Sequence, residues 1–445
     1  MRQPVASGLV THEDRDRARD RLSLRRAYQT HGPRRWLWLL WLSIGPGILV
    51  MLGENDAPSM LSYAATGSRF GIGFFLPFIV ITFVMAVVVQ EMAMRIGAVT
   101  HRGFSELMAD RFGGMWGGLL LTDLLFGNLL TLITEFIGIR AGLGYFHVPP
   151  PIAVSAAIVV IGVAITTGRY WTWERLIMAL AIFNAVFVPI AILSHPAWSE
   201  VAGAMIRFGP MPAWNSNTVL ILVADIGATV TPWMIFFQQA AVADKGLTPA
   251  DMHRGRLDTV LGAVLAAAFA IAAVVATSTL FRHGISVANY QTANFASALR
   301  PFVGRVGASL FALGIVEAGL VAAIAISTAS AYAFAEVRGQ SRSLNRPLKE
   351  AWSFYLTLIG VAVVAGAVVL IPHIPLELVV LLVNVVAVLS TPPIFLFLLL
   401  LANDRQVMGE WVNRTWQNWA AVAVGALITL AGLLFALSVL DPRLI

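Results

Sequence analysis

Residues 45–60 read GPGILVMLGENDAPSM, and this stretch decides the fold. It stands inside an apolar run at 36–66, which is long enough to cross a bilayer because a membrane helix needs roughly 20 apolar residues. Its second half nevertheless carries Glu54, Asn55, Asp56, Pro58 and Ser59. Polar groups at that depth cost several kcal/mol each unless protein or a water-filled cavity surrounds them. The stretch therefore predicts a membrane helix that is interrupted for a functional reason.

The composition of the whole chain is that of a polytopic membrane protein. Of its 445 residues, 58% are hydrophobic and 12% are charged, whereas a soluble domain carries about 25% charged residues. The absence of cysteine excludes disulfides and thiolate metal sites. Apolar runs predict about eleven spans, at residues 36–66, 72–95, 114–144, 151–167, 175–195, 217–243, 257–281, 303–335, 351–372, 375–401 and 418–440.

The basic residues indicate how these spans are oriented. Residues 1–35 contain nine arginines, and with a cytoplasmic N-terminus 23 of the 30 Lys and Arg residues fall on the cytoplasmic side. This bias predicts a plasma-membrane protein with the N-terminus inside and the C-terminus outside. The net charge of +6 is then a topology signal, so no nucleic-acid partner is expected. We expect a basic cytoplasmic tail at 1–35, followed by one transmembrane domain at 36–440 that is monomeric in the bilayer.

A second interruption is predicted in the sixth span, where residues 227–234 read GATVTPWM. Pro232 removes a backbone donor there, and Asp225, Thr229 and Thr231 lie close by in the sequence. Residues 36–195 and 217–401 would then form two inverted repeats, with 418–440 as an added helix. Matching interruptions in two repeats indicate the binding site of a transporter. The alternative is that each proline only kinks its helix.

Side chains and carbonyls of the two breaks offer mainly oxygen. Such ligands favour Mg2+ or Ca2+, whereas thioether and imidazole groups favour softer metals. Mg2+ is usually held by one or two carboxylates and keeps several waters. We expect Asp56 and Asp225 to supply the charge from two facing breaks. The complete set of candidate ligands is Asp56, Ser59, Ala228, Thr231, Asp225, Glu54 and Ala57.

The alternative for each acid inside the spans is a structural role, as the partner of a helix end or of an intramembrane arginine. Glu135 is the clearest case, because Arg140 follows it by little more than one helical turn. Asp123 is expected near the membrane interface, and the role of Glu317 is open.

These motifs resemble the Nramp family of divalent-metal transporters over residues 40–440. Gly45-Pro46-Gly47 matches the family's Gly-Pro-Gly, and 56–59 stands in the place of its Asp-Pro-Gly-Asn. Residues 227–233 correspond to its sixth-helix motif, and 403–413 resembles the exit from its tenth helix. The resemblance implies an all-α LeuT-type fold with a 5+5 inverted repeat and helices 1 and 6 interrupted. It also implies a transporter and not an enzyme, with the metal ion as cargo and no cofactor.

Departures from the family pattern concern the metal and the proton. Ser59 stands in place of the family's asparagine and Thr231 in place of its methionine, while Asp56 and the carbonyl residue Ala228 are kept. Leu132, Trp233 and Gln238 replace an aspartate and two histidines, so three titratable groups are lost. The residues expected along the pathway are Trp233, Gln238, Asn384 and Glu135.

This combination resembles the Nramp-related magnesium transporters. It implies uptake of partly hydrated Mg2+, and also of Mn2+, without proton coupling. Proton-coupled transport of Mn2+ or Fe2+ is the alternative. A carrier of a small organic solute is disfavoured, because acids in both breaks would repel a carboxylate substrate. Whether Asn384 or Ser390 reaches the ion is left open.

Overall fold

The computed structural model describes residues 45–165, 170–287, 292–338, 344, 352–371 and 376–440. By its internal contacts the chain divides into Met1–Gly45 and Pro46–Ile445, and the following description concerns the second unit. The expected tail and the first part of the predicted span at 36–66 lie outside the described residues. Throughout the described ranges the regular secondary structure is helical and includes no strand, which confirms the all-α expectation.

Two runs of helices make up the part of the chain that the structure describes. The first half contains α3 (Pro46–Gly53), α4 (Ala57–Phe70), α5 (Phe75–Thr100), α6 (Phe104–Phe112), α7 (Gly114–Gly144), α8 (Pro150–Ile165), α9 (Tyr170–Ala181), η1 (Ile182–Val186), α10 (Phe187–Leu193) and α11 (Trp198–Ile206). The second half contains α12 (Ser216–Gly227), α13 (Pro232–Lys245), η2 (Pro249–Asp251), α14 (Met252–Arg282), α15 (Thr292–Val337), α16 (Trp352–Val369), α17 (Leu376–Asn403), α18 (Arg405–Met408), η3 (Gly409–Trp411) and α19 (Thr415–Leu440).

Nine segments in these ranges are long and apolar enough to cross a membrane. The shorter apolar helix α8 and the interrupted pair α3–α4 fall on the two remaining predicted spans, so each predicted span has a helical counterpart. Two details add to the expectation. The element α15 contains non-helical backbone at Gly304 (φ 70°, ψ 178°), so it consists of two helices joined at a kink, and the second of them matches the eighth span predicted at 303–335. The fifth span is divided by the short 3-10 segment η1.

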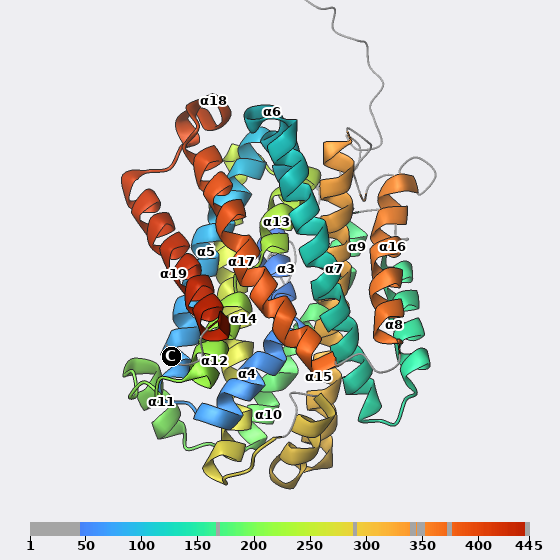
Figure 1. The fold of residues 1–445 in the computed structure, drawn as a ribbon, viewed down its shortest axis with the longest axis vertical. Helices are drawn as coiled ribbons and strands as arrows, with labels where there is room; N and C mark the ends of the chain where they lie inside the picture. Colours follow the sequence, from blue (N-terminus) through green and yellow to red (C-terminus); the bar gives the residue numbers. More distant parts are fainter. Residues whose placement is uncertain are drawn as a thin grey trace, which may run out of the picture. The chain divides into compact units, whose positions relative to one another are not determined.

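The interrupted helices occupy the interior of the bundle. Figure 1 shows α3 and α4 end to end among the other helices, and all eight residues of α3 are buried. Both helices pack on α14, and α4 also contacts α7, α12 and α15. Because a continuous helix would leave no free backbone groups in this interior, the break between α3 and α4 is where the chain can present polar groups there.

Candidate metal site

The first break lies between Gly53 and Ala57 and is organised by Asp56. Asp56 has an extended backbone (φ −71°, ψ 172°), and its Oδ1 accepts a hydrogen bond of 2.8 Å from the Ser59 amide. It is therefore the N-cap of α4, and Pro58 suits the first turn because a proline there forfeits no helical hydrogen bond. Asp56 is only 2% exposed, so its carboxylate is held at a helix N-terminus, away from bulk water.

The second break lies between Gly227 and Pro232. Thr231 has an extended backbone (φ −115°, ψ 155°) and precedes the first residue of α13. The Thr231 amide donates to the sulfur of Met234 at 3.4 Å. Tyr63 of α4 donates its hydroxyl to the Ala228 carbonyl at 3.2 Å, so one carbonyl of this break already faces the first interrupted helix.

The two breaks meet through Glu54 and Thr231. The Thr231 hydroxyl donates to Glu54 Oε2 at 3.0 Å, although the residues are 177 positions apart. Both side chains are buried, and the other oxygen of Glu54 has no hydrogen-bond partner among the described residues. The ring of Trp233 packs beside Gly53, the residue before Glu54: a Cβ added to Gly53 would lie 3.4 Å from it. A desolvated carboxylate with an unsatisfied oxygen is unfavourable unless a cation or water completes it.

Glu135 corrects one expectation. Its Oε2 accepts a hydrogen bond of 3.0 Å from the Ala57 amide, and its other oxygen is unpartnered within the described ranges. Arg140, the proposed partner, instead donates to the Val369 carbonyl at 2.8 Å. Five residues along a helix rotate the side chain by roughly 140° from its starting direction, so the two point apart. Glu135 thus belongs to the first break, against which Gly138 of the same helix packs closely.

Asp225 is hydrogen-bonded to the side of α4. Its carboxylate accepts hydrogen bonds from Ser62 at 2.9 Å and from Thr66 at 3.0 and 3.2 Å. These hydroxyls lie roughly two to three turns along α4 from Asp56. The sequence contained a signal for this contact, because hydroxyls at 59, 62, 63 and 66 recur at the three- and four-residue spacing of one helix face.

The other sequence-predicted residues have different surroundings. Gln238 is fully buried, and neither atom of its amide has a partner in the part of the chain that is described. Glu317 is buried on α15 with both oxygens likewise unpartnered. Ser390 lines a pocket of about 490 Å3 with Asp123, a pocket that includes no residue of either break. Asn384 belongs to α17, but its side chain lies outside the described residues.

Asn55 is a break residue whose role the sequence did not indicate. Its amide nitrogen donates to the Ala266 carbonyl of α14 at 2.9 Å, and its oxygen is buried and unpartnered among the described side chains. Hydrogen bonds of this kind tie the irregular backbone to a neighbouring helix, as buried loops require.

The site is not a ready-made cage of charged ligands. Within the described residues, no three Asp, Glu, His or Cys side chains are grouped so that they could hold an ion by themselves. An ion at the breaks would instead combine one or two carboxylates with hydroxyl and carbonyl oxygens and with retained waters. That ligand set suits a hard, hydrated divalent cation.

Comparison with known proteins gives a family match over most of the chain. Residues 47–438 match the model of the Nramp family, described as natural resistance-associated macrophage protein-like. Divalent metal cation transporter MntH 1 of Pseudomonas aeruginosa is 26% identical over 421 residues, which cover 88% of this chain and 91% of that protein. The MntH transporter of Aeromonas hydrophila is 27% identical over 409 residues, which cover 86% of this chain and 92% of that protein.

Solved structures show the likeness of fold. A manganese transporter from Eremococcus coleocola superposes with a TM-score of 0.70 at 20% identity, over 91% of this chain and 88% of its own. MhsT in complex with L-phenylalanine superposes with a TM-score of 0.56 at 16% identity, over 88% of this chain and 98% of its own.

Proposed function

The chain belongs to the Nramp family of divalent-metal transporters, and from this premise we propose that it carries partly hydrated Mg2+, and also Mn2+, by alternating access without proton coupling. The observation that carries the proposal is the Thr231–Glu54 hydrogen bond of 3.0 Å. It brings a hydroxyl and a carboxylate together at the meeting point of the two interrupted helices.

The choice of ion follows from the chemistry of these groups. Asp56, Glu54 and Thr231 offer only hard oxygen atoms to a cation. The sulfur of Met234 is near the second break and accepts a hydrogen bond of 3.4 Å from the Thr231 amide. The side chains of the Glu54–Thr231 contact themselves offer only oxygen, which gives Mn2+ no advantage over Mg2+. Ser59 and Thr231 are short side chains, which suits an ion that keeps part of its water shell.

Absence of proton coupling is proposed from the residues around the same breaks. Leu132 and Trp233 are buried, and neither can exchange a proton near neutral pH. Gln238 is also buried and is not titratable. The driving force would then be the ion gradient and the membrane potential. A divalent ion entering a negative interior gains roughly 4.6 kcal/mol per 100 mV, twice the value for a single charge.

The remaining organisation is proposed on the charge pattern and the family fold. We place residues 1–35 as a basic tail on the cytoplasmic side of the plasma membrane and the C-terminus outside. Residues 36–440 form the transport domain, with repeats at 36–195 and 217–401 and an added helix at 418–440. We propose that the protein acts as a monomer. Asp56, Ser59, Ala57, Ala228, Thr231 and Glu54 would face the ion, and Asp225 would contribute from its place beside α4.

Proton-coupled Mn2+ or Fe2+ transport is the second candidate. Two observations favour it: the solved relative from Eremococcus coleocola is a manganese transporter, and Glu135 is present beside the first break. A buried carboxyl that touches the Ala57 amide could take up a proton during the transport cycle.

Proteoliposomes that contain a metal-sensitive dye and a pH dye distinguish the two functions. Mg2+ entry without acidification supports the proposal, whereas Mn2+ entry that ignores excess Mg2+ and acidifies the interior would overturn it. Asp56→Ala should abolish the uptake of every metal, while Glu200→Ala, which removes an exposed acid of α11, should not. Thr231→Met should shift the preference toward Mn2+ or Cd2+; an unchanged preference would count against the role of Thr231 in selectivity.

A further inference from the structure

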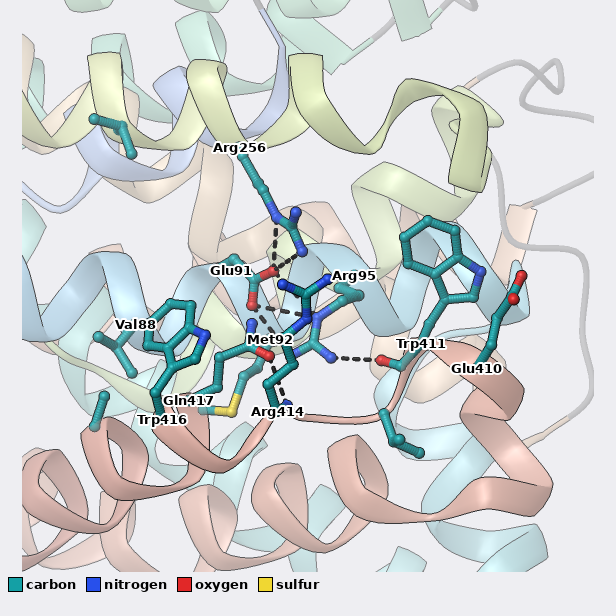
Figure 2. Close-up of a pocket in the computed structure, with 13 residues that line it drawn as sticks. Val88, Glu91, Met92, Arg95, Arg256, Glu410, Trp411, Arg414, Trp416 and Gln417 are labelled. Carbon is teal, nitrogen blue, oxygen red and sulfur yellow. Dashed lines mark hydrogen bonds and ion pairs between the residues drawn. The ribbon is translucent and has the colours of Figure 1, made fainter.

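A pocket of about 520 Å3 lies apart from the two breaks. It forms where the second half of α5 meets α14 and the segment from η3 to the start of α19, as Figure 2 shows. None of its lining residues belongs to the candidate metal site. The lining residues are Val88, Glu91, Met92, Arg95, Arg256, Val260, Glu410, Trp411, Val412, Arg414, Trp416, Gln417 and Ala420.

Two arginines of the pocket share one acid. Arg95 is buried, and its guanidinium pairs with Glu91 at 3.1 Å and also donates to the Trp411 carbonyl and the Asn413 side chain. Arg256 of α14 pairs with the same Glu91 at 2.9 Å. One carboxylate therefore faces two guanidinium groups, and Arg256 is 44% exposed at its side chain. Its remaining donors are available to a second anion.

A third arginine adds positive charge. Arg414 is exposed, and among the described residues its guanidinium has no ion-pair or hydrogen-bond partner, since its hydrogen bonds there, to Gln417 and Asn418, are made by backbone groups. The other acid of the lining is Glu410, whose carboxylate in Figure 2 points away from the Arg95–Glu91 pair. The interior of the pocket consequently has an excess of positive charge that no side chain of the described chain neutralises.

An apolar surface continues from the pocket along α5. Ile81, Val84, Val88, Glu91 and Arg95 follow one another at three- and four-residue intervals and so share one helix face. Ile81 and Val84 are 42% and 58% exposed, whereas Glu91 and Arg95 are charged residues that line the pocket. This face thus passes from apolar to charged at the pocket.

The helices on both sides of this face are also apolar and exposed. Val260 and Val264 of α14 are 45% and 60% exposed, and Trp416 and Trp419 of α19 are 65% and 71% exposed. Both α14 and α19 pack against α5. In a membrane protein such surfaces face acyl chains, and tryptophan is enriched at the level of the headgroups.

We propose that this pocket binds the headgroup of an anionic phospholipid, whose acyl chains lie along the apolar face of α5 between α14 and α19. The phosphate would contact the free donors of Arg256 and Arg414, and Trp416 would lie at the headgroup level. Basic pockets between membrane helices are suited to such lipids. On the topology proposed above, this is the cytoplasmic leaflet, where anionic lipids are concentrated.

The test uses the purified full-length chain in a neutral detergent. Phosphatidylglycerol or phosphatidylcholine is added, and retained lipid is counted by native mass spectrometry while thermal melting is recorded. The wild type should retain phosphatidylglycerol preferentially and melt at a higher temperature with it. The variants Arg414→Gln and Arg256→Gln/Arg414→Gln should lose roughly fivefold and thirtyfold in affinity, from about 1 kcal/mol per basic contact. Arg405→Gln, an exposed arginine of α18 outside the pocket, is the matched control.

Arg414→Gln removes no side-chain hydrogen bond or ion pair seen among the described residues, so its folding should be unaffected. Equal retention of phosphatidylglycerol by Arg414→Gln and Arg405→Gln would overturn the proposal. Displacement of the lipid by millimolar inorganic phosphate would also overturn it, because it would identify a site for a soluble anion. Mg2+ uptake is measured separately, so failure of the lipid site and failure of the proposed transport function give different results.

Discussion

Replacement of Thr231 by valine tests whether the two breaks act as one site. Valine has nearly the same shape as threonine but cannot donate to Glu54 Oε2, a bond of 3.0 Å in this structure. The other Glu54 oxygen already has no partner in the described residues, so the variant leaves both oxygens of a buried carboxylate unsatisfied. We expect Thr231→Val to weaken transport and to lower thermal stability.

The size of the effect follows from the kind of bond that is lost. A hydrogen bond to a charged group contributes roughly 1.5–3 kcal/mol. If the bond supports the ion-binding geometry in the transport cycle, this energy corresponds to roughly 10- to 150-fold in the kcat/KM for Mg2+ uptake. The coupling should appear in a double-mutant cycle with Glu54→Leu, which removes the acceptor, and the double variant should be less impaired than the sum of the single variants.

Uptake by proteoliposomes measures all four corners of this cycle. Thr229→Val is the matched control, because Thr229 is a buried threonine in the same break whose hydroxyl donates to the Asp225 carbonyl of its own chain segment, at 2.6 Å. It should show no coupling to Glu54→Leu. Additive effects of Thr231→Val and Glu54→Leu, or equal coupling for Thr229→Val, would refute the reasoning.

Three further variants test other contacts of the site. Glu135→Gln should still accept the Ala57 amide through its carbonyl oxygen and should keep Mg2+ uptake within roughly threefold at all pH values from 6 to 8; a pH-dependent loss would support proton coupling. Gly138→Ala should reduce uptake strongly, because the new Cβ would lie 2.4 Å from the Ala57 Cβ, whereas Gly127→Ala on the same helix has nothing within 4 Å and should be neutral. Asp225→Leu should destabilise the protein by roughly 1–3 kcal/mol in thermal or denaturant unfolding, because it leaves the buried Ser62 hydroxyl without its acceptor, whereas the Thr66 hydroxyl still donates to the Ser62 carbonyl; Asp225→Asn should restore most of that loss.

Local features of the sequence were sufficient for the positions of both breaks. Pro58 and Pro232 each stand in the first turn of a helix. The N-cap residues of these two helices, Asp56 and Thr231, have extended backbones, as is typical of that position. Acidic and hydroxyl residues beside these prolines indicated polar, buried interruptions, and those at 54, 56, 225 and 231 are buried in the structure.

Partners of the acids were harder to predict. The predicted pairing of Glu135 with Arg140 was wrong, because the helix rotates between the two residues and directs their side chains apart. The pairing of Asp225 was missed because its partners, Ser62 and Thr66, are 163 and 159 positions away. The hydroxyl face of α4 could be read from the sequence, but which helix packs against that face follows from the packing of whole helices.

The sequence by itself determined an all-α membrane protein with two interrupted helices, because hydropathy, proline position and charge bias are local properties of the chain. Only the tertiary structure decided that Glu54 meets Thr231 and that Glu135 meets the start of α4, across 177 and 78 positions of sequence. It also brought Arg95, Arg256 and Arg414 from three distant segments to one pocket. The physical reason is that each of these contacts depends on the rotation and crossing of packed helices, which the interior as a whole sets.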